Sequence, residues 1–248
     1  MKSISWFVSI CAANGLILSD KQAAEFENYL RLLLSWNSRV NLISRKDEAN
    51  FYSHHALNCV SFLFAHRLNP DAKILDLGTG GGLPGIPLKI IYPSLNLTLI
   101  DSIAKKTAVI ADMVHQMGLE NVEILTGRAE ELAKSPELRG KFDYVITRAA
   151  GRLDEVAKWS RGFLSKIPFS GKCFEPVGDK MMPIGIIPSG TLIVLKGGAI
   201  DDELRAARKI KFVDSIEVSD ITFNGMGELE NKDKKIILVK YSASEKKN

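Results

Sequence analysis

Cysteine is scarce in this sequence: Cys11, Cys59 and Cys173 are the only three among 248 residues, and no two form a Cys-x-x-Cys pair. An odd number of widely spaced cysteines does not fit a disulfide framework, and structural zinc sites need closely spaced cysteines or histidines. We therefore expect free thiols in a reducing compartment, a cytoplasmic protein and no metal ion.

Long apolar runs and long basic runs are also missing. A membrane-spanning helix needs about 20 consecutive, mostly apolar residues, and the apolar stretch Ile4–Leu18 is broken by Asn14 and Gly15. We expect a short helix there that packs on the body of the protein, with a signal peptide as the less favoured interpretation and no membrane partner. The 33 basic and 29 acidic side chains give a net charge of +4, and no basic run exceeds two residues. This charge permits a nucleic-acid partner but does not argue for one.

Two hydrophobic patterns divide the chain. Residues 1–70 are predicted to form an N-terminal helical extension, because Ser19 and Gln22 have the spacing of a capping box and apolar residues recur three and four positions apart behind them. Between residues 71 and 242, short apolar runs alternate with helical stretches. This alternation predicts an α/β fold: a doubly wound, mostly parallel seven-stranded Rossmann-like sheet. The predicted strands are 74–77, 97–100, 122–125, 144–147 and 192–195, followed by a terminal hairpin of 215–218 and 236–241.

Two segments do not follow this alternation. Residues 167–188 contain four of the nine prolines and three glycines without a usable periodicity, so we expect a long loop inserted before the fifth strand. Residues 243–248 are expected to be a charged tail.

The most informative segment is a glycine-rich turn between the first predicted strand and a helix. Gly80, Gly82 and Gly85 have the G-x-G-x-x-G spacing of dinucleotide sites, which by itself is a weak signal shared with nicotinamide enzymes. Asp76 precedes the turn, where its carboxylate can meet the ammonium of S-adenosylmethionine, and Asp101 ends the second strand, where it can accept both ribose hydroxyls. These features favour S-adenosylmethionine. The alternative is that both aspartates cap helices and the glycines only make a tight turn.

Two later loops should reach the same edge of the sheet. Ala129 and Glu130 follow the third strand, where the adenine would lie, although Glu130 is also a plausible first-turn helix acid. Arg148 ends the fourth strand and can hold the methionine carboxylate or an RNA phosphate, with a surface ion pair as the alternative. No Asn/Asp-Pro-Pro-aromatic motif follows the fourth strand, which argues against amino-group methylation. No cysteine ends the fourth or fifth strand, which argues against a covalent pyrimidine adduct. His54 and His55 form a neighbouring pair, and we expect a structural role for at least one.

The chain resembles the GidB/RsmG family of bacterial 16S rRNA methyltransferases. The motifs that carry the resemblance are Trp36 to Leu42, Asp76 to Leu88, Asp101-Ser102, Lys105-Lys106, Arg128 to Glu131, Arg148-Ala149 and Leu195 to Gly197. The resemblance implies that Gly78, Leu83, Ala129, Glu130 and Arg148 contact the cofactor and that Asp101 binds its ribose. In one departure, Asn58 stands where the family usually has an aspartate.

The resemblance implies a monomeric enzyme that uses S-adenosylmethionine to methylate N7 of a guanosine in the 16S rRNA of the small ribosomal subunit. Guanine N7 carries a lone pair and no proton, so we expect no general base, with Arg148 and Lys196 as substrate-positioning candidates. RNA contacts are expected from basic residues around the crevice, among them Arg39, Arg45, Lys46, Lys105 and Lys106, each of which is as readily a solvated surface residue. The alternatives are a methyltransferase that acts on a small molecule or protein, and a ribosome-assembly factor that binds the cofactor without turnover.

Overall fold

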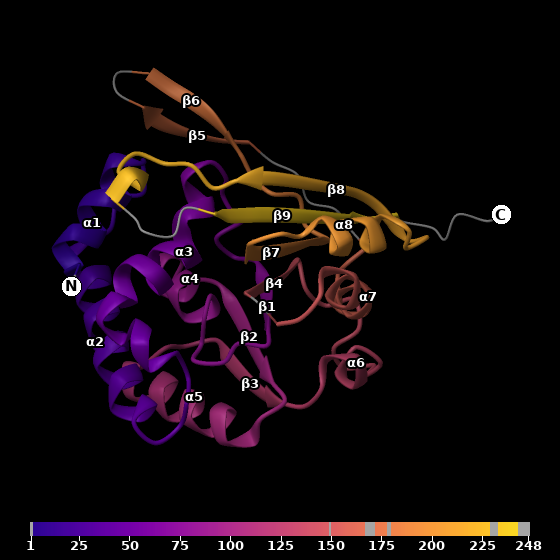
Figure 1. The fold of residues 1–248 in the computed structure, drawn as a ribbon, viewed down its shortest axis with the longest axis horizontal. Helices are drawn as coiled ribbons and strands as arrows, with labels where there is room; N and C mark the ends of the chain where they lie inside the picture. The colour runs from indigo at the N-terminus through magenta and orange to yellow at the C-terminus, as the bar shows by residue number, and fades with distance from the viewer. Residues whose placement is uncertain (1, 149, 167–171, 178–179, 229–232, 243–248) are drawn as a thin grey trace.

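The centre of the protein is a seven-stranded sheet. In a computed structural model, which describes residues 2–148, 150–166, 172–177, 180–228 and 233–242, its strand order is β3-β2-β1-β4-β7-β9-β8 (Figure 1). The first five strands in this order run parallel, and β9 and β8 are antiparallel additions. The strands are β1 (Lys73–Leu77), β2 (Asn96–Asp101), β3 (Val122–Thr126), β4 (Tyr144–Arg148), β7 (Thr191–Gly197), β8 (Val213–Asp220) and β9 (Lys234–Tyr241). The predicted α/β class and all seven strand positions are confirmed.

Helices cover both faces of this sheet, as a doubly wound topology requires. One layer consists of the N-terminal helices together with α4 and α5, and the other consists of α6, α7 and α8 (Figure 1). The helices are α1 (Ile4–Ala13), α2 (Asp20–Asn37), α3 (Leu57–Val60), α4 (Gly85–Ile91), α5 (Ala104–Met117), α6 (Ala129–Leu132), α7 (Leu153–Phe163) and α8 (Asp201–Arg208). Among the described residues, no helix combines the length and the apolar character that crossing a membrane requires.

The helical extension shares its core with the sheet. Ser19 and Gln22 make the predicted capping box at the start of α2, and Phe26 and Leu33 on that helix are fully buried in the same cluster as Leu99 of β2. The short η1 (Arg45–Asn50), the π-helix η2 (Phe51–Ala56) and η3 (Ser61–Phe64) follow α2. The extension is thus a layer of the molecule with no separate core of its own.

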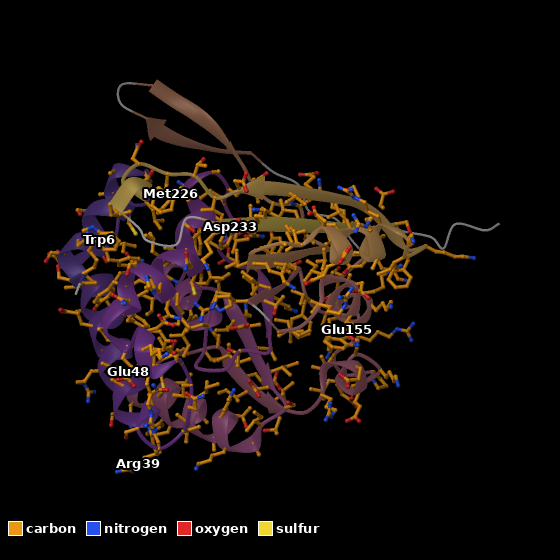
Figure 2. The ribbon with its side chains drawn as sticks, in the orientation of Figure 1. Trp6, Arg39, Glu48, Glu155, Met226 and Asp233 are labelled. Atoms are coloured by element: carbon orange, nitrogen blue, oxygen red, sulfur yellow. The ribbon has the colours of Figure 1, made fainter. Side chains whose placement is uncertain are left out.

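The N-terminal helix packs against the body of the protein, as predicted. Phe7 and Cys11 of α1 are completely buried. Figure 2 labels Trp6 on α1 and Met226 on η4 (Met226–Glu228) at the same end of the molecule. There Asn224 donates its backbone N–H to the side chain of Asn14 over 2.8 Å. The segment between β8 and β9 therefore returns to the first helix.

Residues 167–188 are not the irregular loop that we expected. They contain β5 (Lys172–Val177) and β6 (Lys180–Gly185), which pair as an antiparallel ribbon, while residues 167–171 and 178–179 lie outside the described part of the chain. Both strands of a two-stranded ribbon are edge strands, where proline is tolerated. Pro176 and Pro183 therefore interrupt the alternating pattern that would have predicted these strands, but they do not prevent the hairpin from forming.

Helix α5 buries one apolar face. Ile103 precedes the helix and is 48% exposed, whereas Thr107, Ile110 and Val114 are buried. The buried face thus begins within the helix and does not include Ile103.

Candidate functional site

The glycine turn after β1 brings two distant loops together. Gly78, Gly80 and Gly82 have positive φ angles of 74°, 57° and 93°. The N–H groups of Gly78 and Thr79 both donate to the carbonyl of Ile100 over 2.9 Å, which fixes the turn to the end of β2. A Cβ atom at Gly78 would lie 2.6 Å from the Cβ of Ala150, so only glycine lets the two loops approach this closely.

Asp76 lies beneath this turn and not in an open cleft. Its side chain is completely buried, and its Oδ2 accepts hydrogen bonds from the Thr79 hydroxyl at 2.7 Å and from the Gly85 N–H at 2.8 Å. Burial raises the pKa of Asp76 to about 7, although both hydrogen bonds oppose that rise. The Oδ1 atom is buried without a hydrogen-bond partner. In this structure Asp76 therefore joins the turn to the start of α4, in agreement with the capping alternative.

Asp101 occupies the neighbouring strand end and faces a cleft. Its Oδ2 accepts from the Gly80 N–H at 3.0 Å and its Oδ1 from the Ile103 N–H at 2.9 Å. A carboxylate oxygen can accept more than one hydrogen bond, so both oxygens keep acceptor capacity for a ligand. The same contacts hold the side chain in one orientation.

The first cleft opens at the carboxyl ends of β1, β2 and β3. Its volume is about 500 Å³, within the range of small-molecule sites. Four predicted cofactor residues line it: Gly78, Asp101, Ala129 and Glu130. The other predicted residues do not line it. Asp76, Gly80, Gly82 and Leu83 belong to the glycine turn or lie beneath it, and Arg148 lines a second cleft.

The sequence analysis missed the two lining residues that come from α7. Glu155 and Trp159 reach the first cleft from α7, and Figure 2 labels Glu155 on that helix. Their spacing of four residues places both on one face of the helix. That spacing is the only signal in the sequence, and it does not distinguish a cleft wall from an ordinary surface face.

Arg148 lies at the end of β4, as predicted, but it lines a second cleft of about 510 Å³. Its Nη2 lies 3.0 Å from Nδ1 of His55, which belongs to the helical extension. Burial, and after it the Arg148 guanidinium, lowers the pKa of His55 to about 4. The imidazole is therefore neutral at neutral pH and accepts the arginine's hydrogen bond, so His55 has the structural role expected for one of the two histidines.

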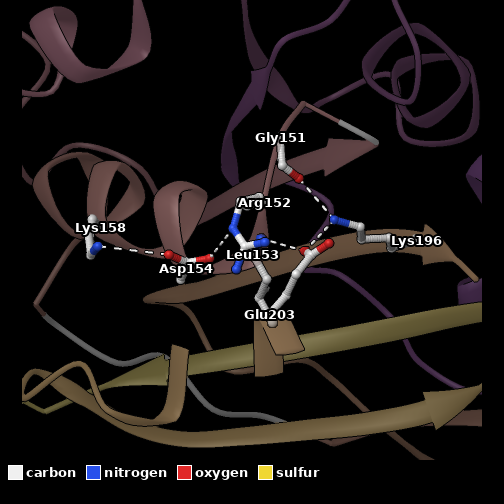
Figure 3. A network of polar contacts seen from close by, with 7 residues as sticks. All are labelled: Gly151, Arg152, Leu153, Asp154, Lys158, Lys196 and Glu203. Carbon is white, nitrogen blue, oxygen red and sulfur yellow. Dashed lines mark hydrogen bonds and ion pairs between the residues drawn. The ribbon is translucent and has the colours of Figure 1, made fainter. Parts of the chain in front are cut away.

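Lys196 also lines the second cleft, but its ammonium group is already engaged. It contacts the carboxylate of Glu203 on α8 and donates to the carbonyl of Gly151 over 3.0 Å (Figure 3). Glu203 in turn accepts from the Leu153 N–H at 2.8 Å. The network fixes the turn that follows β4, so Lys196 positions this turn.

The other basic candidates for RNA contact line neither cleft. Arg39 stacks over the Trp36 ring at 5.7 Å, and Lys105 donates to the Arg39 carbonyl over 3.4 Å. Basic residues that line the second cleft without having been singled out are Lys234 and Lys235 of β9.

Comparisons with known proteins agree with this architecture. A crystal structure of a predicted O-methyltransferase from Agrobacterium tumefaciens superposes with a TM-score of 0.52 at 15% identity, covering 76% of this chain and 81% of the other, which supports the fold alone. A ribosomal RNA small subunit methyltransferase G of Christiangramia forsetii is 35% identical over 203 residues, which are 82% of this chain and 84% of that protein. The protein of that name from Porphyromonas gingivalis is 37% identical over 187 residues, 75% of each chain.

A family model matches a large part of the chain directly. The model described as GidB, rRNA small subunit methyltransferase G, covers residues 22–168, which include most of α2, the glycine turn, Asp101 and Arg148. Its range thus spans the first cleft and most of the helical extension. This chain belongs to the GidB family of rRNA small subunit methyltransferases.

Proposed function

We propose that this protein transfers a methyl group from S-adenosylmethionine to N7 of a guanosine in 16S rRNA. The observation that carries the proposal is the position of Asp101, which is oriented by two backbone N–H groups and faces a cleft of about 500 Å³ beside the glycine turn. An acid at this strand end is suited to the two hydroxyls of an adenosine ribose. Family membership supports rRNA as the substrate.

The residues of the first cleft fit the adenosyl part of this cofactor. Asp101 would accept from the ribose hydroxyls, and Ala129 and Glu130 would provide a backbone donor and a carboxylate acceptor for the adenine edge. Trp159 offers an aromatic surface, and the absence of a Cβ at Gly78 leaves room beside Ala150. When bound, the cofactor supplies an electrophilic methyl group on a sulfonium.

The chain's own residues would act by positioning. The attacking N7 has an in-plane lone pair and no proton, so no side chain needs to remove one. His55 is held neutral by burial and hydrogen-bonded to Arg148, and Lys196 is paired with Glu203. These groups therefore orient the turn and the substrate, and oriented approach can contribute about 7–11 kcal/mol in favourable cases.

We further infer that the protein acts in the cytoplasm, as a monomer, on the small ribosomal subunit. The helical extension, residues 1–70, contributes His55 to the second cleft, and residues 71–242 contribute the first cleft.

The reaction is tested by locating the modification. We expect methyl transfer to a single guanosine of 16S rRNA prepared from cells that lack this protein, and no transfer when that position carries 7-deazaguanine. Single-turnover rates at saturating substrate should be flat above about pH 7.5, because no general base titrates there. Transfer to the 7-deazaguanine RNA, or a pH dependence removed by one substitution in the second cleft, would contradict the mechanism.

Binding of the cofactor is tested at Asp101. Asp101→Ala should weaken S-adenosylmethionine binding at least about tenfold in calorimetric titration, because it removes charge-assisted hydrogen bonds to two hydroxyls. The matched control is Asp143→Ala, which removes a carboxylate that accepts from the Lys73 N–H over 2.9 Å at the opposite edge of the sheet. Equal affinities of both variants for S-adenosylmethionine would show that the cofactor does not bind at Asp101.

A further inference from the structure

The second cleft lies directly beside the first. Arg148, the last residue of β4, lines the second cleft, while Ala150, two positions later, lines the first. The turn after β4 therefore separates the two spaces, and Lys196 and Glu203 hold that turn in place (Figure 3). A base that receives the methyl group must lie next to this turn. The second cleft has the position and, at about 510 Å³, the volume for an unstacked nucleotide.

The polar groups of the second cleft are distributed unevenly. Its four cations all come from the sheet: Arg148, Lys196, Lys234 and Lys235. Asp47, on η1 of the helical extension, is the one acid among the described residues that line it. Lys196 pairs with Glu203, and Lys235 pairs with Asp220 and Asp233, so the donors that the sheet side offers to a base come chiefly from Arg148 and Lys234. The helical side offers a carboxylate acceptor.

The Asp47 carboxylate is held in place but keeps free acceptor capacity. Its Oδ1 lies 3.0 Å from Nδ1 of His54, and its side chain is 37% exposed. An ionised carboxylate has about four acceptor positions, of which the histidine occupies one. Asp47 and His55 line the same cleft as Arg148, whose Nη2 lies 3.0 Å from Nδ1 of His55. A carboxylate among four cations does not help to bind RNA phosphates, so its place in this cleft needs another explanation.

We infer that Asp47 selects guanine by accepting hydrogen bonds from N1–H and the 2-amino group of the target base. This inference rests on the proposed function and deepens it. Guanine presents two adjacent donors, N1–H and the 2-amino group, on its Watson–Crick edge. O6 lies beside them, and O6 and N7 together form the neighbouring Hoogsteen edge. Adenine has an acceptor at N1 and no 2-amino group. A base whose donors face Asp47 turns its O6 and N7 toward Arg148 and the separating turn. Flipped and single-stranded bases are commonly read in this way, by hydrogen bonds to the Watson–Crick edge.

The experiment combines a protein substitution with a base substitution. Full-length 16S rRNA is ligated so that the methylated position carries either guanosine or inosine, which lacks only the 2-amino group. For the unsubstituted protein, we expect kcat/KM for inosine to fall at least about tenfold. In Asp47→Ala, kcat/KM for guanosine should fall by a similar factor, and inosine should then react within about twofold of guanosine.

Two further variants separate specificity from damage to the fold. Asp47→Asn keeps the shape of the side chain and should also lose at least about tenfold on guanosine. Asp214→Ala removes an exposed acid outside both clefts and should behave as the unsubstituted protein. All three variants should keep their affinity for S-adenosylmethionine, because Asp47 does not line the first cleft.

Several results would overturn the inference. One is an unsubstituted protein that methylates inosine and guanosine equally well, a result that does not depend on the folding of any variant. Another is an Asp47→Ala protein that remains as sensitive to inosine as the unsubstituted protein. If the unsubstituted protein transfers no methyl group to 16S rRNA at all, the proposed function fails together with the inference.

Discussion

Asp76 and Asp101 end neighbouring strands but differ in what surrounds them. Asp76 is fully enclosed and both of its hydrogen bonds hold the glycine turn to α4, whereas Asp101 is oriented by Gly80 and Ile103 and faces the first cleft. A carboxylate kept out of water has its charged form disfavoured, while one at a cleft edge can meet a ligand. The two acids therefore have different roles. Asp76 stabilises the glycine turn, and Asp101 offers hydrogen-bond acceptors to a ligand in the first cleft.

The burial of Asp76 predicts a pH effect on stability. Its pKa is about 7 in the folded protein, above the ordinary value of 3.8, so its contribution to stability is full below about pH 4 and is lost as the pH rises toward 7. Asp76→Asn replaces the titrating carboxyl group with a neutral amide, so the variant does not lose this contribution to stability as the pH rises. Relative to the unsubstituted protein, its free energy of unfolding should rise between pH 4 and pH 8 by up to about 4 kcal/mol.

Urea denaturation of both proteins at the two pH values measures this change. The comparison cancels the effect of His55, whose lowered pKa of about 4 makes stability fall as the pH drops below about 6.5. A difference between the two proteins that stays constant with pH would show that Asp76 is not shifted by its burial.

Gly78 allows a test that separates backbone strain from close packing. Gly78→Ala and Gly118→Ala both place a side chain at a positive φ, 74° and 63°, which should cost about 1–2 kcal/mol in each case. A Cβ at Gly118 meets nothing within 4 Å, whereas one at Gly78 meets Ala150 at 2.6 Å. Gly78→Ala should therefore lose about 1–3 kcal/mol more.

Calorimetry on the same pair of variants links packing to binding. Gly78→Ala should weaken S-adenosylmethionine binding, because Ala150 lines the first cleft and must move, while Gly118→Ala should bind normally. Indistinguishable stabilities and affinities would mean that the turn yields to the added methyl group without consequence.

Among the elements, α7 depends on α8 for its start. The side chain of its N-cap residue, Arg152, makes no capping hydrogen bond. Instead, Glu203 of α8 accepts from the Leu153 N–H and neutralises Lys196, which is only 16% exposed (Figure 3). Because α7 also carries Trp159, this one carboxylate connects the wall of the first cleft to the turn beside the second.

Removing that carboxylate should destabilise the protein. Glu203→Ala leaves a helix N–H without its partner and leaves the partly buried Lys196 ammonium with the Gly151 carbonyl but no counter-charge. We therefore expect a loss of about 2–3 kcal/mol in the free energy of unfolding. Asp202→Ala is the matched control: this neighbour is 81% exposed and pairs with Arg205 at the surface, so the change should stay within about 0.5 kcal/mol. Equal losses in the two variants, measured by urea denaturation, would contradict the cap.

At the scale of the whole molecule, the β5–β6 hairpin stands apart from the cofactor region. Figure 1 shows it projecting beyond β8, at the opposite side of the molecule from β3 and α6. The chain that follows it is part of the core, since Ile187 is buried and its carbonyl accepts from the Tyr144 hydroxyl over 2.6 Å. The hairpin and the residues after it should therefore respond differently to deletion.

Replacing residues 168–184 with a short glycine-serine turn should leave S-adenosylmethionine affinity within a few-fold. The matched variant Ile187→Ala keeps the hairpin but should lose about 2–5 kcal/mol of stability, because it opens a cavity in the core. Calorimetry and urea denaturation of both proteins provide the comparison. Loss of cofactor binding in a folded hairpin-less protein would place the hairpin in the site.

Much of the fold was predictable because its signals are local. Each strand is a short apolar run, the capping box is complete within four residues, and Asp101 directly ends its strand. Parallel strand ends meet at one edge of the sheet, so Gly78, Asp101, Ala129 and Glu130 could be assigned to one cleft. The hairpin was missed because its prolines hide the alternation of its strands.

The rest was decided by contacts between residues far apart in the chain. Arg148 turns away from the first cleft because it meets His55, 93 positions earlier, and Asp47 of the helical extension lines the second cleft together with Arg148. Neither contact leaves a periodic or short-range pattern, because packing of two layers creates it. Local signals were enough to predict the strands, the glycine turn and the acid that faces the first cleft. The enclosure of Asp76, the pairing of Lys196 and the second cleft beyond Arg148 arise from packing, since burial and pairing depend on neighbours that folding alone supplies.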